Sequence, residues 1–242
     1  ALAAIYVAAP LAAVLVAGLR ADLPRLAGEA AVHRAAATSL VLAMCAAVLC
    51  LMLTYALVRT RHALARRRGS GSASLPERAM DQGASLVLVV PPIVLGAGWF
   101  ILLRHFADAF AIAPIMVITV NAVMAMPFAL RALRPAYDAA AERHDRLCAN
   151  LGITGFTRLR LIDWPALRRP FLTAFAFAMA LSLGDLGVIA LFGSDQVQTL
   201  PYLLFARLGS YRTADAAGLA LVLAVLCFAL MLLADQRGRT ST

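Results

Sequence analysis

The sequence predicts an all-α, polytopic membrane protein with six transmembrane helices, and three observations predict this fold class. First, 62% of the 242 residues are hydrophobic and 14% are charged, which is more apolar surface than one soluble core can bury. Second, the chain contains six long apolar runs, each close to the ~20 residues that cross a bilayer core as a helix. Third, these runs lack the alternation of apolar and polar residues that marks strands of a membrane β-barrel.

The six expected spans follow the apolar runs in order. Five runs contain no charged residue, and the remaining one is interrupted only by Asp185. The spans cover residues 1–19, 35–58, 83–103, 109–130, 171–194 and 216–234. We therefore expect residues 1–242 to form a single transmembrane domain. The chain begins with Ala1 and has no basic segment before its first run, which favours a fragment or a second half of a longer chain over a signal peptide.

The arginines predict the orientation in the membrane. All 22 basic residues are arginines, and sixteen of them fall in segments 59–78, 131–169 and 235–242, against six in the opposite loops. The positive-inside rule places those three segments and both termini in the cytoplasm. The net charge of +9 is then explained by topology and attraction to anionic lipid, without any nucleic-acid partner.

The composition argues against an enzyme. The chain contains no lysine, so it cannot form the phosphate-binding loop in which a lysine reaches the phosphates of ATP. The four cysteines and four histidines show no metal-ligand spacing, and we interpret the histidines as single, solvated residues in loops. We expect no catalytic residue, no metal and no bound cofactor.

Several spans contain residues that are unusual at membrane depth. Pro91 and Pro92 lie near the middle of the third span, where they would break the helix in a way typical of moving bundles but also found in static ones. Asn121 in the fourth span could bond across helices or contact a substrate. Asp185 is costly in a membrane and indicates a translocation path, a gate or a packing contact.

The segment 131–169 is expected to form a helix, a sharp turn and a second helix. Its apolar positions follow one helical stripe, which consists of Tyr137, Ala140, Ala141, His144, Leu147, Cys148 and Leu151. Gly152 suits a left-handed helix stop, and Thr154 could cap a second helix that ends before Pro165. From spacing alone, the hairpin could equally rest on the membrane surface.

The spacing of Gly152, Ile162 and Pro165 resembles the EAA loop of ABC importer permeases. In that family a short cytoplasmic helix docks onto an ATPase subunit, so the resemblance implies that this segment couples ATP hydrolysis on a partner to transport. Arg146, Leu147 and Cys148 stand where the family pattern has Glu-Ala-Ala. The resemblance assigns these residues and Leu151 to the same contact, with Arg146 facing an acidic residue of the ATPase.

Longer segments resemble the thiamine ABC transporter permeases, within the binding-protein-dependent transport system inner membrane components. The resembling segments are 92–100, 121–127, 146–152, 184–193, 199–202 and 208–212. The resemblance implies a type I ABC importer permease (MetI-like) fold in the inner membrane of a Gram-negative bacterium. It also implies three partners: an ATP-binding ATPase dimer, a periplasmic binding protein and a second homologous six-helix half.

Two details of the resemblance leave alternatives open. The sequence Gly184-Asp185-Leu186-Gly187 is similar to a Gly-Glu-Phe-Gly segment of anion permeases, which favours packing or gating by Asp185 over attraction of a cation. The outer loop 196–213 is either the docking surface for the binding protein or a short helix that closes the outer mouth. The resemblance implies import of thiamine and its phosphates by alternating access, driven by the separate ATPase. The competing functions are import of ferric iron or a polyamine, an autonomous channel or carrier without an ATPase, and a passive scaffold.

Overall fold

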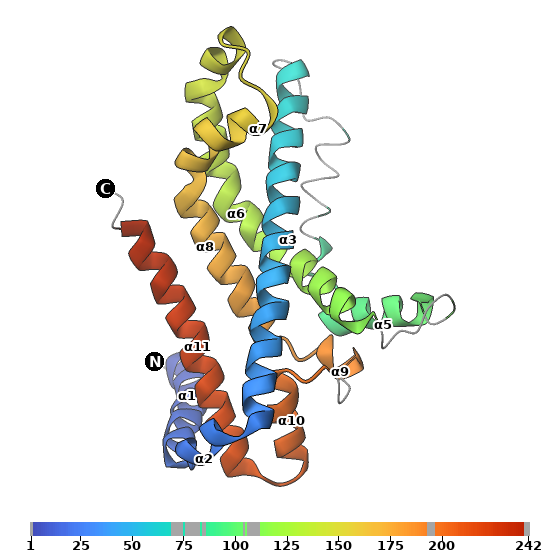
Figure 1. Ribbon diagram of the computed structural model, residues 1–242, viewed down its shortest axis with the longest axis vertical. Coiled ribbons are helices and arrows are strands. Elements are labelled where there is room, and N and C mark those ends of the chain that lie inside the picture. Colours follow the sequence, from blue (N-terminus) through green and yellow to red (C-terminus); the bar gives the residue numbers. More distant parts are fainter. Residues whose placement is uncertain are drawn as a thin grey trace.

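The computed structural model describes residues 2–68, 75, 83, 86–103, 105, 112–192 and 197–239. Every regular element within these residues is a helix (Figure 1). In chain order the elements are α1 (Leu2–Arg20), α2 (Leu23–Gly28), α3 (Ala30–Arg68), α5 (Pro92–Leu103), α6 (Ala113–Asn150), α7 (Gly155–Arg158), the π-helix η1 (Leu159–Asp163), α8 (Trp164–Leu183), α9 (Ile189–Phe192), α10 (Leu200–Gly209) and α11 (Thr213–Arg239).

Three long helices, α3, α6 and α8, form the centre of the molecule and pack against one another, with α11 on the outer side of α8 (Figure 1). Their contact faces are rich in small residues, which let the helix backbones approach closely. In lipid, where the hydrophobic effect does not drive helices together, this close packing holds them to one another. The small residues include Ala43, Ala47, Ala122, Ala125, Ala129, Ala174 and Ala178. Small residues therefore let the backbones approach closely, and larger side chains such as Leu133, Leu167 and Phe171 fill the rest of the core.

Four helical stretches in the described part of the chain are long and apolar enough to cross a membrane. They are Ala30–Arg66, Ala113–Asn150, Gly155–Leu183 and Thr213–Leu232, and shorter apolar helices cover Ala8–Arg20 and Pro92–Leu102. The all-α membrane fold predicted from composition is confirmed. The expected spans 35–58 and 216–234 lie within long helices, as do residues 113–130 of the expected span 109–130, and α1 and α5 occupy the places of the first and third. The expected span 171–194 is wrong at its end, because α8 stops at Leu183 and a turn follows.

The third expected span differs from the prediction because its helix begins at a proline instead of containing one. Pro92 is the first residue of α5, which has 12 residues and is therefore about 18 Å long. Proline lacks the N–H that a helix interior requires and disfavours helical geometry in the residue before it, Pro91. At the first helical position neither property is costly.

The helix, turn and helix expected within 131–169 are present, but both helices are longer than predicted. α6 continues without interruption from Ala113 through Pro127 and Pro135 to Asn150. Beyond the turn, α7, η1 and α8 form one continuous helical stretch, so Pro165 does not end a helix. It lies at the second position of α8, directly after the π-helix η1, and the first turn of an α-helix is where proline is tolerated.

Candidate functional site

The turn after α6 is built around Gly152. Its φ of 63° is a left-handed conformation that side chains with a Cβ rarely adopt. Gly152 N donates to Ala149 O (3.4 Å) and Ile153 N donates to Cys148 O (2.9 Å), which is the paired arrangement of a Schellman motif. This stop reverses the chain sharply, so that α7 leaves α6 at the upper end of the bundle in Figure 1.

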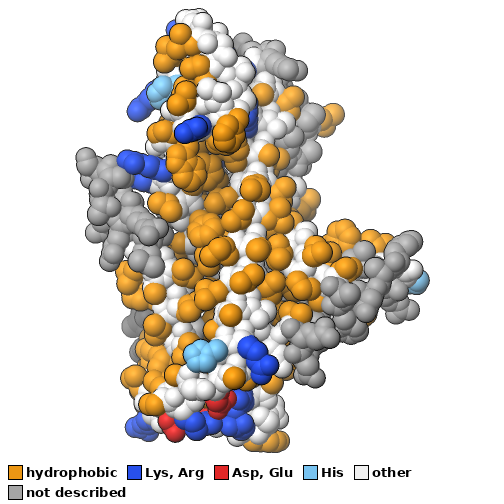
Figure 2. Space-filling view, in the orientation of Figure 1, with side chains coloured by type: hydrophobic (Ala, Val, Ile, Leu, Met, Phe, Trp, Pro, Cys, Tyr) orange, Lys and Arg blue, Asp and Glu red, His pale blue; other side chains and the backbone are white. Residues whose placement is uncertain are grey.

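The residues around this turn present large apolar side chains to the outside. We call residues 146–165 the coupling segment. Its strongly exposed apolar residues are Leu147 (50% exposed), Leu151 (62%), Phe156 (75%), Leu161 (60%) and Trp164 (56%). Arginines lie among apolar side chains on this upper end in Figure 2. An apolar patch of this kind, away from the hydrocarbon-facing middle of the helices, is typical of a protein docking surface.

A cluster of charged residues lies on the inner side of the coupling segment, and Arg158 is at its centre. Arg158 Nη2 lies 2.7 Å from Asp145 Oδ1 at the end of α6, and Arg158 Nε lies 3.4 Å from Asp163 Oδ1 in η1. Both carboxylates are buried, with 8% and 1% of their surface exposed. We call these three residues and their partners on α3 the Arg158 cluster.

Three residues of α3 complete the Arg158 cluster. Tyr55 Oη donates to Asp163 Oδ2 over 2.6 Å. His62 Nε2 lies 2.9 Å from Asp145 Oδ2, and Arg66 Nη1 donates to the same oxygen over 2.8 Å. Burial alone would raise the pKa of Asp145, but the hydrogen bonds from His62 and Arg158 and the positive charges outweigh it and hold this pKa below its usual value.

A second polar site lies where α8 ends. The helix stops at Leu183, and Asp185 Oδ1 accepts a hydrogen bond from Gly187 N over 3.0 Å, which stabilises a turn that competes with further helix. Asp185 thus follows the helix instead of lying inside it. Its second oxygen, Oδ2, is buried and has no hydrogen-bond partner among the described residues.

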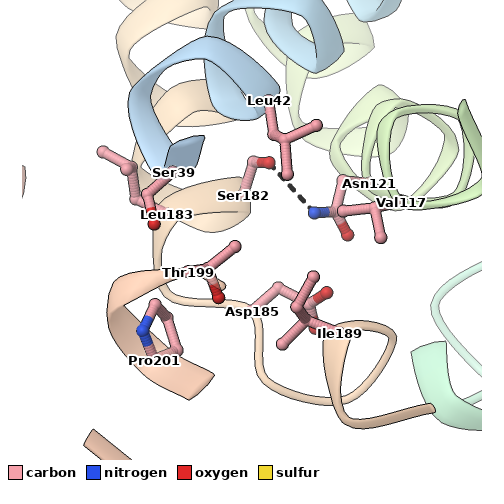
Figure 3. A pocket seen from close by; sticks show the side chains of 10 residues that line it. All are labelled: Ser39, Leu42, Val117, Asn121, Ser182, Leu183, Asp185, Ile189, Thr199 and Pro201. Atoms are coloured by element: carbon pink, nitrogen blue, oxygen red, sulfur yellow. Dashed lines mark hydrogen bonds between the residues drawn. The ribbon is translucent and has the colours of Figure 1, made fainter. Parts of the chain in front are cut away.

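The side chain of Asp185 borders a small cavity in which polar and apolar side chains meet (Figure 3), and we call it the polar cavity after its polar members. The cavity has a volume of about 10 Å³, which is close to the minimum that one water molecule needs. Asn121 on α6 borders it as well, and its Nδ2 donates to Ser182 Oγ on α8 over 3.0 Å. The other lining residues are Ser39, Leu42, Val117, Leu183, Ile189, Thr199 and Pro201. Residues from α3, α6, α8 and α10 therefore converge here.

The opposite end of the bundle carries a separate network of ions, visible at the lower end of Figure 2. Asp215, at the start of α11, is paired with Arg25, Arg207 and Arg212. Glu29 pairs with Arg25 over 2.7 Å and with Arg207 over 2.6 Å. We call these five residues the Asp215 cluster. It connects α2, α10 and α11, and its arginines are engaged by its own carboxylates.

The comparison with protein families agrees with this architecture. The model described as binding-protein-dependent transport system inner membrane component matches residues 71–236. This chain belongs to that family. The matched range contains α5 to α10 and most of α11, so it includes the coupling segment and every residue that lines the polar cavity except Ser39 and Leu42 of α3.

Curated relatives in the family are similar over almost the entire chain. The thiamine transport system permease protein ThiP of Brucella abortus (strain 2308) is 64% identical over 98% of this chain and 42% of its own length. The protein of the same name from Escherichia coli (strain K12) is 39% identical over 97% of this chain and 43% of its own length. This chain therefore spans about two fifths of the relatives that it matches.

A solved structure supports the permease fold independently. A chain from the crystal structure of an amino acid ABC transporter with histidines superposes with a TM-score of 0.60, covering 86% of this chain and 92% of that chain. The two share 13% identity, so the likeness concerns the fold alone. It agrees with the type I ABC importer permease fold expected from the sequence.

The family motif residues occupy two different environments. Arg146, Leu147, Leu151 and Pro165 are exposed, whereas Ile162 is half-buried and Cys148 is buried. The structure thus brings the first four to the outside of the coupling segment. Cys148 instead faces the bundle, where it accepts from Ile153 through its backbone oxygen.

The Arg158 cluster was not predicted from the sequence, and two expectations about it are wrong. Asp145 is not a member of the helical stripe expected from the sequence, yet it is buried because cationic side chains from two other elements pair with it. His62 was interpreted as a solvated loop residue, yet it lies within α3 and contacts Asp145. The available signal was Asp163, an acidic residue between Ile162 and Trp164.

Proposed function

We propose that this chain is the membrane-spanning part of an ABC importer that moves thiamine and its phosphates across the cytoplasmic membrane by alternating access. ATP would be hydrolysed by a separate ATPase dimer, and this chain would bind no cofactor of its own. The exposed apolar surface around the Gly152 turn carries the proposal, because such a surface needs a protein partner. Because this surface coincides with the segment that resembles the EAA loop, we propose that the partner is an ATPase.

The proposed contact with the ATPase uses exposed residues of the coupling segment. Leu147 and Leu151 lie at the end of α6, and Phe156 follows on α7, so the turn presents a short, rigid apolar knob. A rigid helix pair of this shape suits a cleft on a partner. Arg146 is exposed beside it and would meet an acidic group of the ATPase. Pro165 and Ile162 would support the segment from its second helix.

Thiamine as the substrate rests on the relatives. A 64% identity across nearly the whole chain to a thiamine transport system permease supports the same substrate more strongly than import of ferric iron or a polyamine. Because the matched relatives are more than twice as long as this chain, we propose that a second homologous six-helix half completes the permease. A periplasmic binding protein would deliver the substrate.

The outer surface proposed for the binding protein is the region of α10. Phe205 and Leu208 on this helix are 55% and 47% exposed, and Tyr211 just beyond it is 92% exposed. Exposed aromatic residues are enriched in protein interfaces. This assignment puts the arginine-rich coupling segment and both termini in the cytoplasm, with the opposite end of the bundle in the periplasm. The membrane would be the inner membrane of a Gram-negative bacterium.

Asn121 and Asp185 are the proposed residues of the translocation path or its gate. They border one polar cavity between helices that are otherwise packed by apolar residues. The cavity is far smaller than thiamine, so transport requires these helices to separate. The hydrogen bond from Asn121 to Ser182 crosses between two of the helices that would have to move.

The decisive experiment is reconstitution of the complete permease in proteoliposomes with its ATPase and binding protein. We expect ATP-dependent uptake of labelled thiamine that excess ferric iron or polyamine does not reduce. Phe156→Asp on α7 should abolish copurification of the ATPase without preventing membrane insertion, whereas Ala139→Asp at an exposed site on α6 should retain it. Uptake that persists without any ATPase would disprove the proposal, and competition by iron or polyamine would reassign the substrate.

A further inference from the structure

We infer that Arg158 is a positioning residue that transmits movement of the coupling segment to the helices around the polar cavity. The inference rests on the proposed function, because it concerns how the docked ATPase would act on this chain. It assigns a role to Arg158, Asp145 and Asp163, none of which belongs to the family motif described above. The role follows from where the two carboxylates lie.

Arg158 connects three separate parts of the backbone. It stands on α7 and reaches Asp145 on α6 and Asp163 in η1, while only 13% of its side chain is exposed. A guanidinium can hold two carboxylates at once because its donors form a rigid planar fork. The two short helical elements after the Gly152 turn are thereby fixed to the end of α6.

The same carboxylates are held from α3. Tyr55 bonds to Asp163, and His62 and Arg66 bond to Asp145. Tyr137 of α6 packs edge-on against both Tyr55 and His62, and Arg158 lies 5.9 Å from the centre of its ring. The Arg158 cluster therefore ties the coupling segment to α3 as well as to α6, through charged groups that are costly to separate when buried.

Each helix held by the cluster also lines the polar cavity. α3 contributes Ser39, α6 contributes Asn121, and α8, which continues directly from η1, contributes Ser182. Asn121 precedes Asp145 by 24 residues on the uninterrupted helix α6, which corresponds to about 36 Å. A rigid helix transmits a displacement over such a distance if its end is firmly attached.

The exposed face of the coupling segment is available for docking, and its buried face attaches the segment to the bundle. Leu151 and Phe156 point outward and are available to the ATPase, whereas Arg158 points inward and holds the segment to the bundle. The π-helix η1 lies between Arg158 and α8, and such turns often mark functional sites. Without Arg158, an ATPase could still dock and hydrolyse ATP, but the movement would be lost within the segment.

The test compares Arg158→Lys with the exposed control Arg143→Lys in the complete transporter in proteoliposomes. Lysine keeps the charge but, as a single ammonium group, cannot reproduce the planar fork. We expect Arg158→Lys to retain ATPase binding and ATP hydrolysis while thiamine imported per ATP hydrolysed falls roughly fivefold. Tyr55→Phe should lower the same ratio to a smaller extent, and the control should leave it unchanged.

The ratio of transport to hydrolysis separates coupling from simple stability. Loss of folded transporter lowers both rates together and leaves the ratio constant. An unchanged ratio in both Arg158→Lys and Tyr55→Phe would overturn the role of Arg158 while leaving the proposed function intact. Absence of ATP-driven thiamine uptake in the unmodified transporter would overturn the proposed function and this inference with it.

Discussion

Arg207 Nη1 lies 3.1 Å from Asp215 Oδ2, and this ion pair joins α10 to the start of α11. Asp215 is 7% exposed and is also paired with Arg25 and Arg212. One buried carboxylate thus holds arginines from three parts of the chain. Asp215 thus shares with Glu29 the task of balancing the positive charges at this end of the bundle.

Replacing Asp215 with Asn should destabilise this end of the bundle. The amide removes the carboxylate paired with Arg212 and leaves Glu29 alone to balance Arg25 and Arg207, and the lost charged hydrogen bonds should cost about 1–2 kcal/mol. We expect a lower melting temperature in detergent than for the unmodified protein. Glu142→Gln, the same change at an exposed position of α6, should leave the melting temperature unchanged. Equal melting temperatures for the two variants would show that the Asp215 cluster adds no stability.

A methyl group at Gly18 should disrupt the packing of α1 against α11. A Cβ at this position would lie 2.7 Å from Leu221 Cβ and 2.8 Å from the backbone oxygen of Ala217, so the helices would have to separate. We expect Gly18→Ala to lower stability by about 2 kcal/mol. Gly28→Ala is the matched control, because a Cβ there meets no atom within 4 Å. Thermal unfolding in detergent would measure both, and an equal response would contradict the close contact.

The helices of this fold could be predicted from the sequence because lipid requires each span to be apolar along its length. The start of α5 could not be placed, because an apolar run shows neither where a helix starts within it nor that Pro92 would be its first residue. The end of α8 was also missed. Gly184 and Asp185 lie inside an apolar run, and the turn depends on a local hydrogen bond to Gly187.

The candidate site was predictable only where it depends on local sequence. Gly152 could be identified as a helix stop because its role is set by its own backbone angle. The partners in the Arg158 cluster could not, because Tyr55 and Asp163 are 108 positions apart in the chain. No periodicity links such residues, and their contact follows from the packing of α3 against α6 and α8.

The left-handed turn at Gly152 predicts different effects for two substitutions. No atom lies within 4 Å of a Cβ built on Gly152, so the cost of a side chain comes from φ alone. Valine should cost about 1–2 kcal/mol there and misplace the coupling segment, whereas asparagine tolerates this conformation. We expect Gly152→Val to reduce ATPase copurification and thiamine uptake, and Gly152→Asn to retain both. Loss of both copurification and uptake in the asparagine variant would instead show that the ATPase must approach the backbone at position 152 closely.

Substitutions of Asp185 should separate its role in the turn from its charge. Asparagine keeps an oxygen that can accept from Gly187 N, whereas alanine removes it. If Asp185 acts by packing or gating, Asp185→Asn should transport thiamine at nearly the normal rate and Asp185→Ala should be severely impaired. Uptake into proteoliposomes would distinguish them. Equal, severe loss in both variants would instead show that transport needs the negative charge.

Acidification should release the Arg158 cluster through Asp145. Its pKa is lowered in the folded protein, so the carboxylate contributes stability above the unfolded-state pKa of about 4 and loses that contribution as the pH falls through the lower folded value. At pH 7 we expect Asp145→Asn to be less stable than the unmodified protein by about 2 kcal/mol. The difference in melting temperature should shrink as the pH is lowered below about 4, because protonation then removes the same charge from Asp145. A difference in melting temperature that stays constant to low pH would show that the stabilising interaction of Asp145 is not ionic.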